Sequence, residues 1–109
     1  MNNLEIILDK DTIVLKGNAT KYTNISNKNL RLYEVINILE LFDKTKLGFL
    51  QKEIIIDLDG VTKIDTVGLA VFMQWMRELN KINLELKFIN INEKINYACR
   101  LYGVSNVFA

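Results

Sequence analysis

Two short apolar runs open the chain. Residues 4–8 (LEIIL) and 12–17 (TIVLKG) are rich in aliphatic side chains, and the polar triplet Asp-Lys-Asp separates them. Short apolar runs around a polar turn predict a β-hairpin. Residues 18–29 (NATKYTNISNKN) are polar and rich in asparagine, which is typical of a loop.

Residues 30–42 show a helical pattern. Apolar side chains recur there at intervals of three and four residues, at Leu32, Val35, Ile36, Leu39 and Phe42. This spacing puts the apolar groups on one side of a helix and predicts an amphipathic helix over residues 30–42.

The second half of the chain alternates strand-like and helix-like segments. Residues 53–58 (EIIIDL) form a continuous apolar run, which is typical of a central strand buried on both faces. We expect residues 59–64 (DGVTKI) to be a turn and a lead-in to a helix over residues 66–81. Residues 84–89 (LELKFI) alternate and predict another strand.

A last helix is predicted over residues 92–103 (NEKINYACRLYG). Asn92 is suited to cap its start, and Gly103 is suited to end it. Residues 104–109 (VSNVFA) are either a short strand or a packed tail.

This order of elements defines the fold class. Strand–helix–strand units this close together imply right-handed crossovers and parallel pairing, while the first hairpin adds an antiparallel piece. We therefore expect an α/β fold, with a small mixed sheet of four or five strands and three helices packed mainly on one face. The length of the chain, 109 residues, predicts a single domain over residues 1–109.

The helix that begins at Thr66 has more apolar surface than one packed face needs. At 100° per residue, the core-facing arc holds Leu69, Phe72, Met73, Met76 and Leu79. The opposite arc holds Val67, Val71, Gln74 and Glu78, with Trp75 at its edge. Val67, Val71 and Trp75 are then either isolated exposed apolar residues, which are common, or a surface that another protein covers.

The start of this helix allows two interpretations. Asp65 or Thr66 can cap the first turn, a contribution of about 1 kcal/mol. Alternatively, Thr66 is a phosphoacceptor or a contact point for a partner, because a phosphate there would meet unpaired N–H groups and the positive end of the helix dipole. Gly68 would let another backbone or a bulky group approach closely.

Composition excludes several classes of function. The formal net charge is +1 and no block of Lys or Arg occurs, so we expect no nucleic-acid partner. The chain has no His and a single cysteine, Cys99, which excludes an internal disulfide and Ser-His or Cys-His nucleophile pairs. A zinc site in this chain would have to use carboxylates alone, whereas zinc sites in proteins are built mainly from Cys and His. We therefore expect no metal and no cofactor.

The sequence also lacks a signal peptide and any stretch long enough to cross a membrane. We therefore expect a cytoplasmic protein with no direct membrane insertion, which reaches a membrane only through a partner.

An enzyme is the weakest interpretation. Asp57, Asp59 and Asp65 cluster near the end of the buried strand, where ligand sites of α/β proteins lie, and they could hold Mg²⁺. However, the chain has no phosphate-binding Gly-Lys loop and no apparent general base, and Asp59-Gly60 is simply explained as a turn. We expect no catalysis.

The second half of the chain resembles the STAS domain, which is shared by sulfate transporters and anti-sigma factor antagonists. The similarity covers residues 53–104 well and the first half only by the order of elements. It is carried by Asp57-Leu58, Val61, Ile64-Asp65, Thr66 and Gly68-Leu69-Ala70.

Within this family, Asp-Thr-x-Gly-Leu-Ala at residues 65–70 and Leu-Tyr-Gly-Val at residues 101–104 are similar to MlaB-like proteins. These are the cytoplasmic STAS subunits of the Mla phospholipid ABC transporter, which maintains the lipid asymmetry of the outer membrane. The resemblance implies a non-catalytic subunit that binds and stabilises the ATPase, in a complex with a permease and a lipid-binding subunit at the inner membrane. It implies a partner contact at Asp65, Thr66, Val67, Gly68, Val71 and Trp75.

The alternative within the family is an anti-sigma factor antagonist. In those proteins a serine usually stands at the position of Thr66, and an anti-sigma kinase phosphorylates it to break the complex with the anti-sigma factor. Thr66 would then be the phosphoacceptor. The loop after the second strand often carries an acidic residue, whereas residues 17–20 here read Gly-Asn-Ala-Thr.

Overall fold

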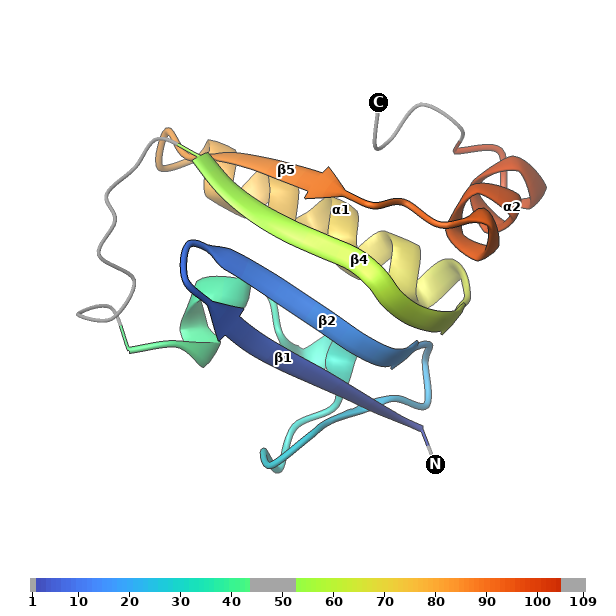
Figure 1. The fold of residues 1–109 in the computed structure, drawn as a ribbon, viewed down its shortest axis with the longest axis horizontal. Coiled ribbons are helices and arrows are strands. Elements are labelled where there is room, and N and C mark those ends of the chain that lie inside the picture. The colour runs from blue at the N-terminus through green and yellow to red at the C-terminus, as the bar shows by residue number, and fades with distance from the viewer. Residues whose placement is uncertain (1, 44–52, 105–109) are drawn as a thin grey trace.

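The computed structural model describes residues 2–43 and 53–104 (Figure 1). In this part of the chain the strands are β1 (Asn3–Asp9), β2 (Thr12–Ala19), β3 (Asn24–Ile25), β4 (Glu53–Ile64) and β5 (Glu85–Ile89). The α-helices are α1 (Thr66–Asn80) and α2 (Glu93–Leu101). Residues 105–109 of the predicted last strand or tail lie outside the described residues.

The strands form one mixed sheet in the order β3-β1-β2-β4-β5. The predicted hairpin is confirmed, because β1 and β2 pair antiparallel from Leu4 opposite Gly17 to Asp9 opposite Thr12. The predicted parallel pairing is confirmed as well, because β4 pairs parallel with β2 on one side and with β5 on the other. Helix α1 connects β4 to β5 and lies behind the sheet in Figure 1.

Strand β4 is longer than the sequence predicts. It has 12 residues and includes residues 59–64, so the predicted turn at Asp59-Gly60 was wrong. The pairing of β4 with β2 shifts once after Asp57 and again after Val61, each time by one extra residue on β4. Each bulge adds one unpaired residue to β4 and bends the strand, so β4 continues through residues that are typical of a turn.

Burial on β4 alternates, so the prediction of a strand buried on both faces was also wrong. Ile54, Ile56 and Leu58 are buried, whereas Ile55 and Asp57 between them are half-buried. The sheet therefore has one face covered by the rest of the chain and one outer face. This arrangement agrees with the prediction that the helices pack mainly on one side.

The predicted helix over residues 30–42 is replaced by two 3-10 turns, η1 (Leu32–Glu34) and η2 (Ile38–Leu41), so the chain has two described α-helices rather than three. Between the turns, Val35 and Asn37 have extended backbones, and the Asn37 side chain accepts a hydrogen bond from the N–H of Leu39. Leu32, Val35 and Ile38 are fully buried at intervals of three residues. That interval suits a 3-10 turn, which repeats every three residues.

Trp75 joins α1 to this segment. Its indole Nε1 donates a hydrogen bond of 2.7 Å to the carbonyl oxygen of Val35, and its side chain is fully buried. The ring centroid of Phe72 lies 5.3 Å from that of Trp75 and 5.6 Å from that of Phe88 on β5. Helix α1 is therefore packed from two directions, by the sheet and by the 3-10 turns.

Replacing Trp75 with phenylalanine should test the link to Val35. The smaller ring keeps most of the apolar contact but leaves the Val35 carbonyl without its donor, so we expect the free energy of unfolding to fall by about 1–3 kcal/mol. Urea unfolding followed by far-UV circular dichroism measures this loss. The exposed Arg77→Gln on the same helix is the control, with a change within about 0.5 kcal/mol. An equally small change for Trp75→Phe would show that the hydrogen bond adds little.

Candidate functional site

Asp65 holds the start of α1 in place. Its Oδ1 accepts a hydrogen bond of 3.0 Å from the N–H of Gly68, so the predicted cap is confirmed, with Asp65 as the capping residue. Its Oδ2 accepts a second hydrogen bond, of 3.0 Å, from the N–H of Lys21. One carboxylate thus fixes both the helix start and the loop that follows β2.

The loop after β2 is ordered by its own threonines. The Thr23 hydroxyl accepts a hydrogen bond of 2.9 Å from the N–H of Thr20, and both side chains are buried. This arrangement leaves Lys21 and Tyr22 at the surface, with the Lys21 ammonium 5.0 Å from the centre of the Tyr22 ring. The loop predicted over residues 18–29 is shorter than expected, because residues 18–19 belong to β2 and residues 24–25 form β3 at the edge of the sheet. Only its start, at Lys21, meets the first turn of α1.

Gly68 permits a close approach within the chain itself. A Cβ atom at this position would lie 2.0 Å from the carbonyl oxygen of Ala19, which is much shorter than any contact that a real Cβ atom makes. The same carbonyl accepts a hydrogen bond of 3.2 Å from the N–H of Asp65. The end of β2 thus occupies the space that the missing side chain leaves free.

Thr66 is exposed at the first position of α1. Its N–H, like that of Val67, has no acceptor within the helix because both belong to the first turn. A hollow of about 160 Å³ opens beside it, and the residues that line the hollow are Thr66, Leu69, Ala70, Met73, Tyr102 and Val104. The Thr66 hydroxyl therefore lies at the edge of a small, largely apolar depression.

The profile of the STAS domain family matches residues 18–109. This chain belongs to the STAS domain family. No curated protein matches it. STAS domains are generally non-enzymatic, so family membership is consistent with a regulatory or accessory role without catalysis.

The structure corrects the predicted faces of α1 in this STAS domain. The buried residues of the helix are Gly68, Leu69, Val71, Phe72, Trp75 and Leu79. Val71 and Trp75 were expected to be surplus apolar groups for a partner, but 4% and 0% of their surfaces are exposed. The error arose because η1 and its neighbours pack on the arc that the sheet leaves open. Val67 is half-buried.

The apolar surface that sequence reasoning missed lies on α2 of the STAS domain. Tyr97 and Leu101 are each 60% exposed and Tyr102 is 42% exposed, whereas Ile95 and Cys99 on the other side of α2 are buried. Tyr97 and Leu101 are four residues apart and share one side of the helix. This spacing was available in the sequence as a signal of a second apolar face. The helix ends as predicted, with Gly103 at φ +71° after Tyr102.

The three aspartates do not converge on one point. Asp57 Oδ1 accepts hydrogen bonds from the N–H of Asp59, at 2.9 Å, and from Asn90 Nδ2, at 3.1 Å, while Asp65 serves as the cap. Within residues 2–43 and 53–104, no group of three or more His, Cys, Asp or Glu side chains is arranged to hold a metal ion. The carboxylates of Asp57 and Asp65 thus hold neighbouring parts of the chain in place.

Cys99 is the remaining candidate for chemistry. It is buried, and burial raises the pKa of its thiol. A protonated, buried thiol is a poor nucleophile at neutral pH, so Cys99 acts as a small apolar core residue. Neither described helix of the STAS domain is long and apolar enough to cross a membrane.

Replacing Gly68 with alanine should destabilise the STAS domain severely. The new methyl group would meet the Ala19 carbonyl, which belongs to the backbone and cannot move aside without breaking the link to Asp65. We expect a loss of several kcal/mol in the free energy of unfolding, measured by urea unfolding.

The matched control uses the opposite change two residues further along. Helix propensity alone predicts that Ala70→Gly costs about 1 kcal/mol and that Gly68→Ala gains about the same amount. Gly68→Ala should nevertheless be the more damaging substitution. If it instead stabilised the domain, the close contact with Ala19 would be contradicted.

Proposed function

We propose that this STAS domain is an accessory subunit that binds and stabilises the ATPase of an Mla-type phospholipid ABC transporter. The observation that carries the proposal joins the two sequence motifs. Thr66, from Asp-Thr-x-Gly-Leu-Ala, and Tyr102, from Leu-Tyr-Gly-Val, line the same hollow although they are far apart in the sequence. Both motifs are similar to those of MlaB-like proteins, and their meeting at one surface supports a shared role in binding.

The chemistry of this surface suits a neutral, apolar contact. The hollow of about 160 Å³ has room for one apolar side chain of a partner, and the residues that line it carry no charge. Full burial of one leucine or phenylalanine would contribute about 1.5–3 kcal/mol. The Thr66 hydroxyl can donate one hydrogen bond and accept others at the edge of that contact.

The proposed interface is centred on Thr66, with Val67 beside it. Asp65 and Gly68 contribute by fixing the position of the helix start. Val71 and Trp75 belong to the core, so the proposal no longer includes them. Association with the inner membrane, and with the permease and lipid-binding subunits, would follow from the ATPase contact.

An anti-sigma factor antagonist is the second candidate. Exposure of Thr66 at the helix start favours it, because a kinase can reach the hydroxyl there and a phosphate would meet the unpaired N–H groups of the first turn. In this case Thr66 is the phosphoacceptor, and the partner is an anti-sigma factor. The two candidates differ in whether Thr66 acts by contact or by modification.

Binding to the ATPase of an Mla-type transporter from the same host tests the first candidate. We expect the STAS domain to raise the melting temperature of that ATPase, with a stabilisation of about 2.7 kcal/mol when the domain is present at a hundred times its Kd. Thr66→Ser should bind like the wild type because the hydroxyl remains. Thr66→Glu should bind at least about tenfold more weakly, because it brings an unpaired charge into an apolar contact.

The stability of each variant provides the control. Asp65, not Thr66, caps the helix, so Thr66→Ala and Thr66→Glu should change the melting temperature of the isolated domain very little. Asn96→Ala, at an exposed position on α2, should leave both stability and binding unchanged. Wild-type affinity for Thr66→Glu would contradict the proposed contact.

Intact mass spectrometry distinguishes contact from modification. We expect protein purified from its native host to carry an unmodified Thr66 while it is bound to its partner and after its release. A stoichiometric phosphoryl group on Thr66 that appears with partner release would favour the anti-sigma factor antagonist instead.

A further inference from the structure

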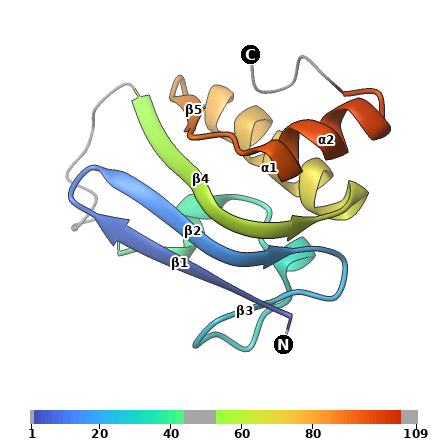
Figure 2. The ribbon, with the colours of Figure 1, turned by 45° about the vertical axis from the view of Figure 1, so that its right-hand side comes forward.

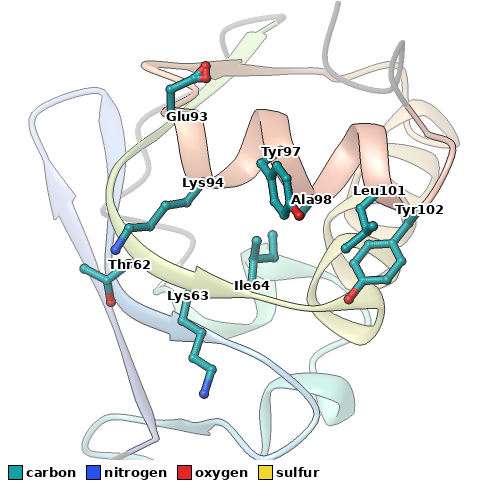
Figure 3. Close-up of a pocket in the computed structure, with 9 residues that line it drawn as sticks. All are labelled: Thr62, Lys63, Ile64, Glu93, Lys94, Tyr97, Ala98, Leu101 and Tyr102. Atoms are coloured by element: carbon teal, nitrogen blue, oxygen red, sulfur yellow. The ribbon is translucent and has the colours of Figure 1, made fainter.

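A second depression lies between α2 and the end of β4, separate from the body of the Thr66 hollow. Its volume is about 370 Å³. Ile64 points from β4 toward α2, and Tyr97 and Leu101 extend toward it from α2 (Figure 3). Figure 2 shows α2 running beside the end of β4 that precedes α1. We call this depression the α2 groove.

The large apolar side chains along the α2 groove lie outside the core. Tyr97 and Leu101 are each 60% exposed, and Tyr102 at the end of the helix is 42% exposed. The core contacts of α2 come from the opposite side of the helix, through Ile95 and Cys99. Three large apolar side chains thus remain in solvent on one face, an arrangement that marks interaction surfaces.

Positive charge lies on the β4 side of the α2 groove. Lys94 extends from α2 toward Thr62 on β4, whereas Lys63 extends from β4 away from α2 (Figure 3). Neither lysine forms an ion pair with another residue of the described chain. Glu93 points away from the groove at its far end. The groove therefore combines an apolar wall with a positively charged border.

We infer that the α2 groove binds an amphipathic helix of a partner protein that carries a carboxylate on one border of its apolar face. The apolar side chains of that helix would pack against Tyr97 and Leu101, and its carboxylate would meet Lys94 and Lys63. Helix α2 has nine residues and is about 13 Å long, so about two turns of the partner would lie along it. Partner helices in grooves are held by such apolar anchors three, four and seven residues apart.

Other occupants fit the α2 groove less well. A pocket for a small molecule buries most of its ligand, whereas Tyr97 and Leu101 in this groove are more than half exposed. An anionic membrane is recognised by clusters of about four to eight basic residues, and this groove has two lysines.

A second copy of this chain, docked through α2 against α2, would bring Lys94 against the partner's apolar side chains. Contact between two helices of only about 13 Å would also bury much less area than the roughly 800 Å² per partner that a stable dimer buries. The inference holds whether or not the partner is an ATPase, so it goes beyond the proposed function.

A pair of synthetic helical peptides tests the inference. The acidic peptide has leucines at positions i, i+4 and i+7 and glutamates along one border of that face, and the basic peptide has lysines in place of the glutamates. Each is titrated into the isotope-labelled STAS domain while amide signals are followed by NMR. We expect the acidic peptide to shift the signals of Ile64, Tyr97 and Leu101 and to bind at least about tenfold more tightly than the basic one.

Charge reversal makes the test sharper. The double variant Lys63→Glu with Lys94→Glu should prefer the basic peptide, and Leu101→Ala should weaken binding of both peptides. Lys87→Glu, an exposed lysine on β5, should leave the preference unchanged. Thr66→Glu should also bind the acidic peptide normally, so failure of this inference is distinguishable from failure of the Thr66 contact. The melting temperature of each variant reports whether it folds.

Four outcomes would overturn the inference. The first is equal binding of the two peptides, and the second is a set of shifted signals that excludes the α2 groove. The third is binding of phosphatidylglycerol vesicles, but of neither peptide, at Tyr97 and Leu101. The fourth is a shift of those same signals with protein concentration alone, which would assign the groove to a second copy.

Discussion

The structure depends on the packing of α1 from two directions. The sheet has only one covered face, so the helix that lies on it forms the centre of the core. The side of that helix that carries Val71 and Trp75 would be exposed to water if the 3-10 turns did not pack against it, and the hydrogen bond from Trp75 to the Val35 carbonyl fixes their position. Leu32, Val35 and Ile38 supply the apolar contacts of this second layer. A helix covered along such a broad arc needs more apolar surface than one that packs on a sheet alone.

This double packing determines where the STAS domain can meet a partner. The sheet and the 3-10 turns cover one broad arc of α1, and the opposite arc, which begins at Thr66 and includes Arg77, is exposed. The first turn is held by the Asp65 carboxylate and by the contact of Gly68 with the end of β2, so the Thr66 hydroxyl is presented from a rigid base. The outer side of α2 is free because the core uses only its opposite side. Both surfaces are thus consequences of how the core is filled.

Local signals in the sequence predicted the hairpin, the parallel order of the strands and both α-helices, because apolar periodicity and capping residues such as Asn92 act over a few neighbours. Residues 30–42 were mispredicted because apolar groups three residues apart suit either kind of helix, and the packing against α1 decides between them. The burial of Val71 and Trp75 could not be read from the helix alone, since periodicity shows which residues share an arc but not what covers it. For the same reason, the spacing of Tyr97 and Leu101 signals an apolar face on α2, but only the packing of the core shows that this face is exposed.

The burial of Trp75 also gives the domain an intrinsic fluorescence signal of its folded state. Trp75 is the only tryptophan of the chain, and its indole is enclosed beside Phe72 with no exposed surface. Its fluorescence therefore reports the integrity of the native core around it. A ligand that occupies the surface at Thr66 or along α2 leaves the indole enclosed, whereas unfolding exposes it to water and shifts its emission to longer wavelengths. A shift of this emission in a binding experiment thus indicates loss of structure and not occupancy of either surface.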